Sequence, residues 1–195
     1  MLEPPLILAS ASPRRRELLA QLGVPFEVIP CALPEPEGPP TEVTPASWAE
    51  ALAYFKARSV AGEHPGRWVL GADTIVVCAG QLLGKPADLA DARRMLELQA
   101  GRSSQVITGV ALVKVGAAES RIVAHEVTRV WMRDDPVERE RYLASGDWRG
   151  KAGAYGIQDV QDRLVERLAG SFSNVVGLPL ELVGRLLGAL RRPGR

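Results

Sequence analysis

The sequence predicts an α/β fold in which a mixed sheet is flanked by helices. Three observations support this class. Apolar runs of strand length alternate with segments of helical period, Gly, Pro and Ser residues separate them, and two long strand-like segments follow each other as a hairpin. No internal repeat and no sharp change in composition divides the chain, so we expect one domain over residues 1–195. Two lobes that share a cleft are a variant of the same architecture.

Apolar runs bounded by turn-forming residues predict the strands. They cover residues 6–9, 26–30, 68–77, 82–83, 105–115, 122–132, 164–168 and 175–176. The third run contains Gly71-Ala72-Asp73-Thr74, so we interpret it as a pair of strands interrupted at that point.

Helical spacing and capping residues predict the helices. Ser12 is expected to cap the N-terminus of the first helix, with Pro13 in its first position. Gly23 is expected to end that helix. The others are expected at residues 47–61, 89–99, 136–145 and 181–190. Residues 34–45 are rich in Pro, Glu and Gly and are expected to form a loop.

The composition excludes several functional classes. The chain has 24 basic and 23 acidic residues, so it lacks the basic excess of a dedicated nucleic-acid-binding protein. Its two cysteines cannot build a disulfide framework or a four-thiolate zinc site. No apolar run approaches the ~20 residues of a membrane helix, and the first residues do not resemble a signal peptide. We therefore expect a cytoplasmic enzyme or binding protein without a membrane or a stable nucleic-acid partner.

The first candidate site is the turn from the first strand into the first helix. Ser10 and Ser12 supply hydroxyl groups there, and Arg14, Arg15 and Arg16 lie in the first helical turn. Cations at a helix N-terminus oppose the helix dipole unless an anion binds between them. Hydroxyls, backbone N–H groups and guanidinium groups together favour a polyphosphate over a merely solvated charged face.

The second candidate is Asp73, which lies among strongly apolar strand residues. A buried carboxylate is costly unless it is paired or binds a metal. Gly71 and Ala72 leave room for a ligand to approach the backbone. The alternative is that Asp73 caps a helix or pairs with an arginine.

Lysines are rare in this chain, which makes each one worth inspecting. Only four of the 24 basic residues are lysines, namely Lys56, Lys85, Lys114 and Lys151. Lysine is a compact point charge that suits phosphate oxygens. For each lysine taken alone, the simplest interpretation is a solvated side chain.

Six sequence blocks in order resemble the Maf family of nucleoside triphosphate pyrophosphatases, which was once described through a septum-formation phenotype. They are S-A-S-P-R-R at residues 10–15, L-A-Y-F-K-A at 52–57, G-A-D-T at 71–74, G-K-P at 84–86, K-A-G-A-Y-G-I-Q at 151–158 and V-V-G-L-P at 175–179. Each block alone is weak evidence for the resemblance, but the order and spacing of all six over nearly the whole chain are specific to this family. Three of the four lysines fall inside them.

The resemblance implies a fold shared with the inosine triphosphate pyrophosphatases, with substrate bound in a cleft between two lobes. It also implies hydrolysis of a nucleoside triphosphate between the α and β phosphates, a divalent metal and a homodimer. Arg14, Thr74 and Gln158 are similar to the branch that prefers dTTP and UTP rather than the one that prefers 7-methyl-GTP. The Gln158 amide and the Thr74 hydroxyl each supply a donor and an acceptor, as a pyrimidine imide edge requires.

The same resemblance assigns a role to each candidate residue. Arg14, Arg15, Lys56 and Lys85 would bind phosphates, with Ser10 and Ser12 donating to them. Glu35 and Asp73 would hold Mg²⁺ or Mn²⁺, since hard cations prefer oxygen ligands. Asp73 would also be the general base. The chain departs from the family at Gly150, where an aspartate is common, and in the neighbours of Glu35.

The sequence is also compatible with two other functions. One is a house-cleaning hydrolase that acts chiefly on modified nucleotides. The other is a nucleotide-binding regulator of cell division in which hydrolysis is not essential. A pure binding protein has no need of a base, so Asp73 and Glu35 favour catalysis.

Overall fold

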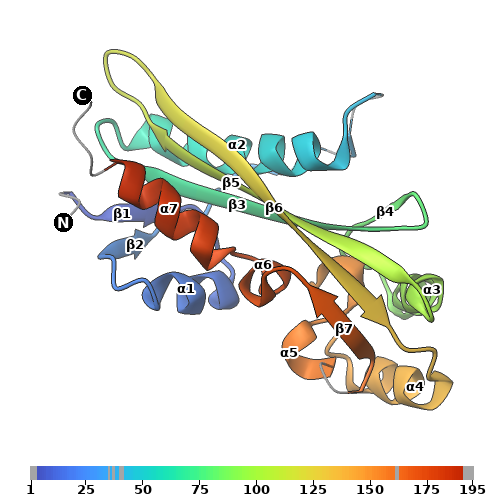
Figure 1. The fold of residues 1–195 in the computed structure, drawn as a ribbon. Coiled ribbons are helices and arrows are strands. Elements are labelled where there is room, and N and C mark those ends of the chain that lie inside the picture. Colours follow the sequence, from blue (N-terminus) through green and yellow to red (C-terminus); the bar gives the residue numbers. More distant parts are fainter. Residues whose placement is uncertain (1–3, 35, 37, 40–41, 161–162, 191–195) are drawn as a thin grey trace. The chain divides into compact units, whose positions relative to one another are not determined.

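The computed structural model describes residues 4–34, 36, 38–39, 42–160 and 163–190. Within them the strands form one seven-stranded sheet in the order β2-β1-β3-β5-β6-β7, and β4 pairs with β3 (Figure 1). The strands are β1 (Leu6–Leu8), β2 (Phe26–Val28), β3 (Val69–Cys78), β4 (Gln81–Leu83), β5 (Ser103–Lys114), β6 (Ser120–Met132) and β7 (Val165–Ala169). The sheet is mixed: β1 pairs in parallel with β2 and β3, whereas β4 and β7 pair antiparallel with β3 and β6.

The helices connect and flank these strands. They are α1 (Pro13–Ala20), α2 (Pro45–Glu63), α3 (Leu89–Gln99), α4 (Pro136–Ser145), the 3-10 turn η1 (Ala152–Ala154), α5 (Ile157–Val160), α6 (Phe172–Val176) and α7 (Leu180–Leu190). In the part of the chain that the structure describes, no helix is both long and apolar enough to cross a membrane.

The chain divides into two compact units, which are described separately. The first unit contains residues 1–73, 108–126 and 177–195. Its core lies between α2 and the strands β1, β3 and β5, and is made of small and branched apolar side chains. These residues are Ile7, Ala9, Ala53, Ala57, Val60, Ala61, Val69, Ala111 and Val113.

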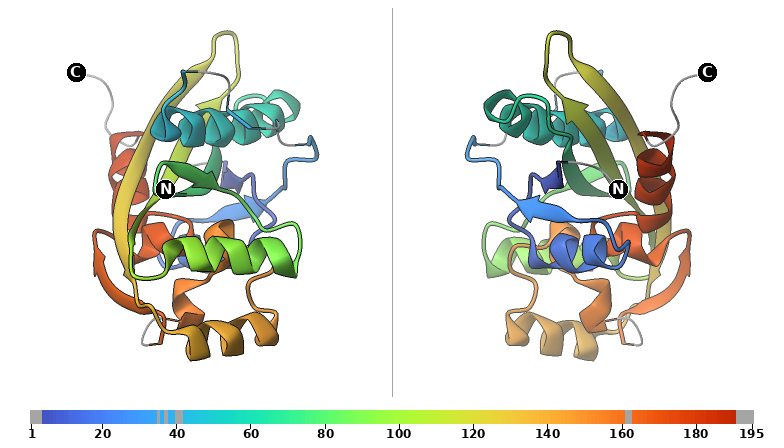
Figure 2. Two further views of the ribbon diagram at one scale, coloured as in Figure 1. Left: turned by 90° about the vertical axis from the view of Figure 1, so that its right-hand side faces the viewer. Right: turned by 90° about the vertical axis from the view of Figure 1, so that its left-hand side faces the viewer.

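Two glycines let α2 lie directly on the strands of the first unit. A Cβ at Gly71 of β3 would come within 2.3 Å of the Ala53 carbonyl oxygen, and one at Gly109 of β5 within 2.2 Å of the Ala49 oxygen. Any side chain at either position would push the helix away from the sheet. Figure 2 shows α2 beside the β5–β6 hairpin in both views, where the Tyr54 hydroxyl donates to Glu119 Oε1 at 2.8 Å.

The second unit contains residues 74–107 and 127–176. It holds the end of β3 with β4, and α3 packs against both η1 and α4. A buried polar network lies where β6 meets the segment before α6. Asn174 Nδ2 donates to the Val106 carbonyl at 3.0 Å and to Thr128 Oγ1 at 2.9 Å, and Thr128 Oγ1 donates to the Ser171 carbonyl.

The structure confirms the expected mixed α/β sheet with flanking helices and corrects three elements. Residues 69–78 form one continuous strand, so the predicted interruption at Gly71 is wrong: the glycine makes room for α2 instead. The predicted strand at residues 175–176 is also wrong, because these residues end helix α6. That helix begins where Ser171 Oγ accepts from the Asn174 N–H at 3.2 Å. Finally, α2 begins at Pro45 rather than residue 47, since Thr44 Oγ1 caps it by accepting from the Ser47 N–H.

Candidate active site

The turn after β1 has the geometry that its two serines predict. Ser12 caps α1, and its Oγ accepts from the Arg15 N–H at 3.4 Å. Ser10 is buried, and its Oγ accepts from the Ser12 N–H at 3.2 Å. The first turn of α1 contains Arg14 and Arg15 and no acidic residue. The local field therefore favours an anion.

Arg15 is held in place by two oxygens of the first unit. Its Nε donates to the Gly177 carbonyl at 2.9 Å, and its Nη1 donates to Ser10 Oγ at 3.4 Å. Gly177 has a φ of 126°, in the region that favours glycine. No sequence signal assigns a role to Gly177 itself, although it lies in the closing block at residues 175–179. The carbonyl of Gly177 thus orients a guanidinium group that we expected to bind phosphate.

Lys56 and Asp73 form a buried ion pair. The Lys56 Nζ lies 2.5 Å from Asp73 Oδ1, and each side chain is only 10% exposed. Lys56 belongs to the face of α2 that packs on the sheet, not to a solvated face. The contact of α2 with Gly71 places this turn of the helix over β3, which brings the ammonium to the carboxylate two residues further along the strand.

The parallel pairing of β1 with β3 places the serine turn beside Asp73. Leu8 pairs with Leu70, and the Ala9 N–H donates to the Leu70 carbonyl at 2.8 Å. Continuing that register sets Ser10 alongside the Gly71–Asp73 stretch, at the carboxyl end of β1. Ligands of α/β sheets bind at the carboxyl ends of parallel strands. Ser10, Ser12, Arg14, Arg15, Lys56 and Asp73 thus all belong to the first unit.

Thr74, Lys85 and Gln158 lie in the second unit. The antiparallel register of β3 with β4 pairs Val76 with Leu83, and continuing it sets Thr74 opposite Lys85. The Gly153 N–H donates to the Gly84 carbonyl at 3.0 Å, which joins the turn of Lys85 to the segment that precedes Gln158. Lys85 and Gln158 are exposed, and Thr74 is half-buried.

Two ionisable groups of the second unit are unsuited to nucleophilic chemistry. Burial raises the pKa of the Cys78 thiol and that of the Tyr155 phenol above their ordinary values. Both groups are therefore protonated at neutral pH. Cys78 is a buried residue at the end of β3.

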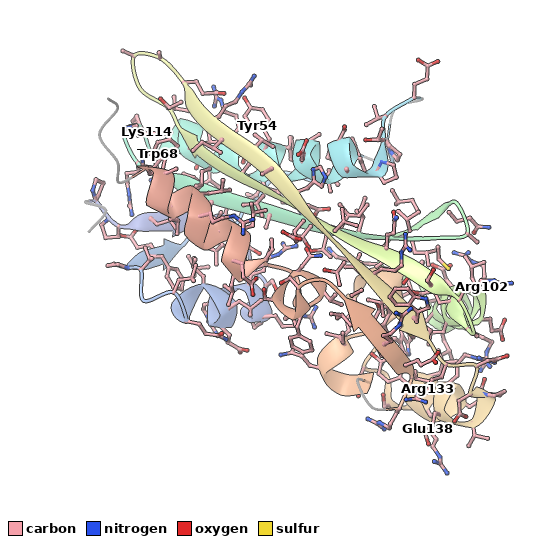
Figure 3. The ribbon with its side chains drawn as sticks, in the orientation of Figure 1. Tyr54, Trp68, Arg102, Lys114, Arg133 and Glu138 are labelled. Carbon is pink, nitrogen blue, oxygen red and sulfur yellow. The ribbon has the colours of Figure 1, made fainter. Side chains whose placement is uncertain are left out.

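The fourth lysine, Lys114, has a structural contact of its own. Its Nζ lies 5.3 Å from the centroid of the Trp68 ring, a cation–π distance. Figure 3 shows the two labelled side chains close together at one end of the first unit. Lys114 is the lysine that the six sequence blocks leave out. It ends β5, whereas Asp73 lies in the middle of β3.

The predicted ligands of a divalent metal are Asp73 and Glu35. Glu35 lies outside the described residues, and among those described no three His, Cys, Asp or Glu side chains are grouped closely enough to hold an ion. Asp73 offers one carboxylate, whose Oδ1 already accepts from Lys56. Mg²⁺ is commonly held by one or two carboxylates together with substrate phosphates and water, so this donor set fits a cation that arrives with its substrate.

Comparisons with known proteins agree with the motifs and with the fold. A family model described as Maf-like protein matches residues 5–190. A dTTP/UTP pyrophosphatase of Symbiobacterium thermophilum is 50% identical over 186 residues, which cover 93% of this chain and 92% of the relative. The corresponding protein of Deinococcus radiodurans is 46% identical over 184 residues, 94% of this chain and 92% of the relative.

One solved structure is similar in fold. A HAM1 protein from Coxiella burnetii superposes with a TM-score of 0.55 and 18% identity, and the match covers 94% of this chain and 98% of that one. This likeness concerns the fold alone and agrees with a mixed sheet flanked by helices. The family match spans nearly the whole chain and contains all six sequence blocks, so this protein belongs to the Maf-like family.

Proposed function

We propose that this protein hydrolyses nucleoside triphosphates between the α and β phosphates, with dTTP and UTP as its preferred substrates. Water adds to phosphorus, the bridging P–O bond breaks, and a nucleoside monophosphate and pyrophosphate leave. The names of the relatives, dTTP/UTP pyrophosphatase, support this assignment. The observation that carries it is the buried Lys56–Asp73 pair beside the serine and arginine turn that follows β1.

Asp73 is the group that we assign to proton transfer. Its carboxylate is buried, and the Lys56 ammonium fixes its orientation at 2.5 Å. A positioned carboxylate can accept a proton from the attacking water, which typically contributes a rate factor of about 10² to 10⁴. The Lys56 ammonium lies at this carboxylate, and we assign it to binding a phosphate oxygen as well, since lysine is a compact charge that suits phosphate.

The arginines of the first unit supply positive charge for the polyphosphate. Arg15 is oriented by Gly177 and Ser10, and Arg14 lies next to it in the first turn of α1. Phosphoryl transfer depends mainly on positioning and on neutralising charge in the transition state. Preorganised guanidinium groups meet both needs.

The proposed reaction requires a divalent cation, Mg²⁺ or Mn²⁺. Asp73 and Glu35 are the residues that would hold it. Such a cation, when bound, neutralises phosphate charge and lowers the pKa of coordinated water.

The second unit contributes the residues that we assign to substrate recognition. Lys85 is a further phosphate ligand in this proposal, and Thr74 and Gln158 read the base. Their hydroxyl and amide can each donate and accept a hydrogen bond, which matches the alternating groups of a uracil or thymine edge. A cytoplasmic location and a homodimer also belong to the proposal, on the strength of family membership.

A pyrophosphate-release assay tests the proposal. The purified full chain is assayed with dTTP, UTP, dCTP, dGTP, GTP and 7-methyl-GTP, with and without Mg²⁺ or Mn²⁺. We expect metal-dependent release that is fastest with dTTP and UTP. Fastest release from 7-methyl-GTP would support a house-cleaning hydrolase instead. Tight nucleotide binding without turnover would support a regulatory binding protein. Equal rates with purine and pyrimidine triphosphates would overturn the roles of Thr74 and Gln158.

A further inference from the structure

Gln99 is a fully buried amide at the end of α3. None of its surface is exposed, and its Nε2 donates two hydrogen bonds. One goes to the Met95 carbonyl at 3.0 Å, one helical turn earlier, and the other to the Gly153 carbonyl at 2.8 Å. Since both acceptors are carbonyl oxygens, the amide must present its nitrogen to them. The side chain therefore ties α3 to η1, two elements that are 54 residues apart in sequence.

Packing alone does not explain an amide at this position. The Gln99 Oε1 atom is buried and has no hydrogen-bond partner among the described residues. A buried polar atom without a partner destabilises the folded state, and an apolar side chain of the same length would fill the space without that penalty. The bond to Gly153 is the contact that an apolar side chain could not make.

The N–H and the carbonyl of Gly153 both make hydrogen bonds. Its N–H donates to the Gly84 carbonyl at 3.0 Å, while its carbonyl accepts from Gln99. Its φ is 69°, and a Cβ there would lie 3.0–3.2 Å from the Val76 side chain. This residue therefore rests on β3 in a conformation that favours glycine. The arrangement fixes the turn of Lys85 and the segment of Gly153 relative to each other.

A second buried group holds the far end of the same segment. The Tyr142 hydroxyl, from α4, accepts from the Gly156 N–H at 3.1 Å. The Tyr142 side chain is buried, and the Lys151 Nζ lies 6.0 Å from its ring centroid. Residues 151–156 thus make hydrogen bonds to both α3 and α4. Gln158 follows after Ile157 and is exposed.

We propose that Gln99 is a positioning residue for substrate recognition. It fixes the loop of residues 151–156, and through that loop it sets the location of Gln158 and of the Lys85 turn. This inference rests on the proposed function, because Gln158 and Lys85 are assigned there to the substrate. In metal sites, removing a group that orients a metal ligand commonly changes affinity or activity by about 10-fold to 100-fold, and we expect an effect of that order here.

The variant Gln99→Met tests the inference. Methionine has a similar length and volume but cannot donate to the Gly153 carbonyl. Met95→Leu is the matched control, since it exchanges a buried side chain one turn away in α3 without touching the loop bonds. Both proteins are compared with the wild type by thermal unfolding, by hydrogen exchange over residues 150–158 without substrate, and by steady-state kinetics.

We expect Gln99→Met to exchange the amides of Gly153 and Gly156 faster than the wild type, whereas Met95→Leu does not. With dTTP, we expect KM to rise about tenfold while kcat changes little, because binding rather than chemistry is disturbed. The preference for dTTP over dGTP should fall in parallel. Unchanged exchange at these amides would overturn the inference, and so would a fall in kcat with an unchanged KM.

The exchange experiment separates this inference from the proposed function. A wild-type protein that hydrolyses none of the nucleotides would contradict the proposed function, yet exchange would still show whether Gln99 holds the loop. Conversely, a wild type that prefers dTTP, with a Gln99→Met variant that matches it in exchange and in KM, would overturn only the role of Gln99.

Discussion

The carbonyl oxygen of Ala53 on α2 occupies the space that a side chain at Gly71 of β3 would need. A Cβ at Gly71 would lie 2.3 Å from that oxygen and 2.8 Å from the Ala57 nitrogen. Helix and strand therefore meet backbone to backbone. One turn further along α2, the same approach brings Lys56 to Asp73.

Gly71→Ala should destabilise the protein strongly, because the added methyl group meets helix backbone that cannot rotate away. We expect a loss of about 3 kcal/mol in the free energy of unfolding, at the upper end of overpacking effects. Gly184→Ala in α7 is the matched control, since nothing lies within 4 Å of a Cβ there. That change should stabilise the protein by up to about 1 kcal/mol. Equal unfolding midpoints in urea for the two variants would contradict the close approach.

The Lys56–Asp73 pair should behave as a buried pair. Lys56→Met leaves the Asp73 carboxylate buried without its cation, and we expect a loss of about 3–5 kcal/mol. The double variant with Asp73→Leu should recover much of this loss, because an apolar pair replaces an unpaired charge. Urea unfolding of the two variants measures the difference.

An exposed ion pair provides the comparison. Arg94 pairs with Asp91 on α3, and its side chain is 54% exposed. Arg94→Met should therefore cost no more than about 1 kcal/mol. A Lys56→Met variant as stable as Arg94→Met would show that the buried pair contributes nothing.

Gln158→Glu should weaken the preference for pyrimidine nucleotides. The carboxylate keeps the acceptor oxygens but loses the donor that a pyrimidine carbonyl requires. We expect kcat/KM for dTTP and UTP to fall about tenfold, as the loss of one hydrogen bond implies, with dGTP changed less. Gln105→Glu, at an exposed position of β5, controls for added negative charge. An unchanged ratio of dTTP to dGTP activity would remove Gln158 from base recognition.

Chelation of divalent metal should stop turnover without unfolding the protein. In the structure Asp73 is paired with Lys56, so the fold has an internal cation for that carboxylate. We expect EDTA to abolish pyrophosphate release and Mg²⁺ or Mn²⁺ to restore it, while the thermal midpoint shifts little. Full activity in EDTA would contradict the metal assignment to Glu35 and Asp73.

Local signals predicted the elements that carry the site, and their success has a physical reason. The serine, the proline and the apolar run at residues 6–13 act on their own neighbours in the chain. Ser12 caps α1 as expected, and β1 ends just before Ser10. Asp88 likewise caps α3, with its carboxylate accepting from the Asp91 N–H.

Features that depend on distant contacts could not be predicted in this way. Gly71 reads as a strand breaker in sequence, and only the backbone of α2 shows that it belongs inside a strand. Lys56 reads as a solvated residue until its helix face is known to pack on β3. Gln99 and Gly177 carry no local signal for the bonds that they make to Gly153 and Arg15.

In the proposed mechanism Asp73 accepts the proton during hydrolysis, and the variant Asp73→Asn is the decisive test of that role. The amide keeps the shape of the side chain and an oxygen for Lys56, but it leaves the ammonium without its carboxylate, so urea unfolding must first show that the variant is folded. Asp134→Asn, at a side chain that is 67% exposed, is the matched control. We predict that single-turnover release of pyrophosphate from dTTP falls at least about 100-fold in Asp73→Asn and not in Asp134→Asn. A folded Asp73→Asn protein that releases pyrophosphate at the wild-type rate would contradict the claim.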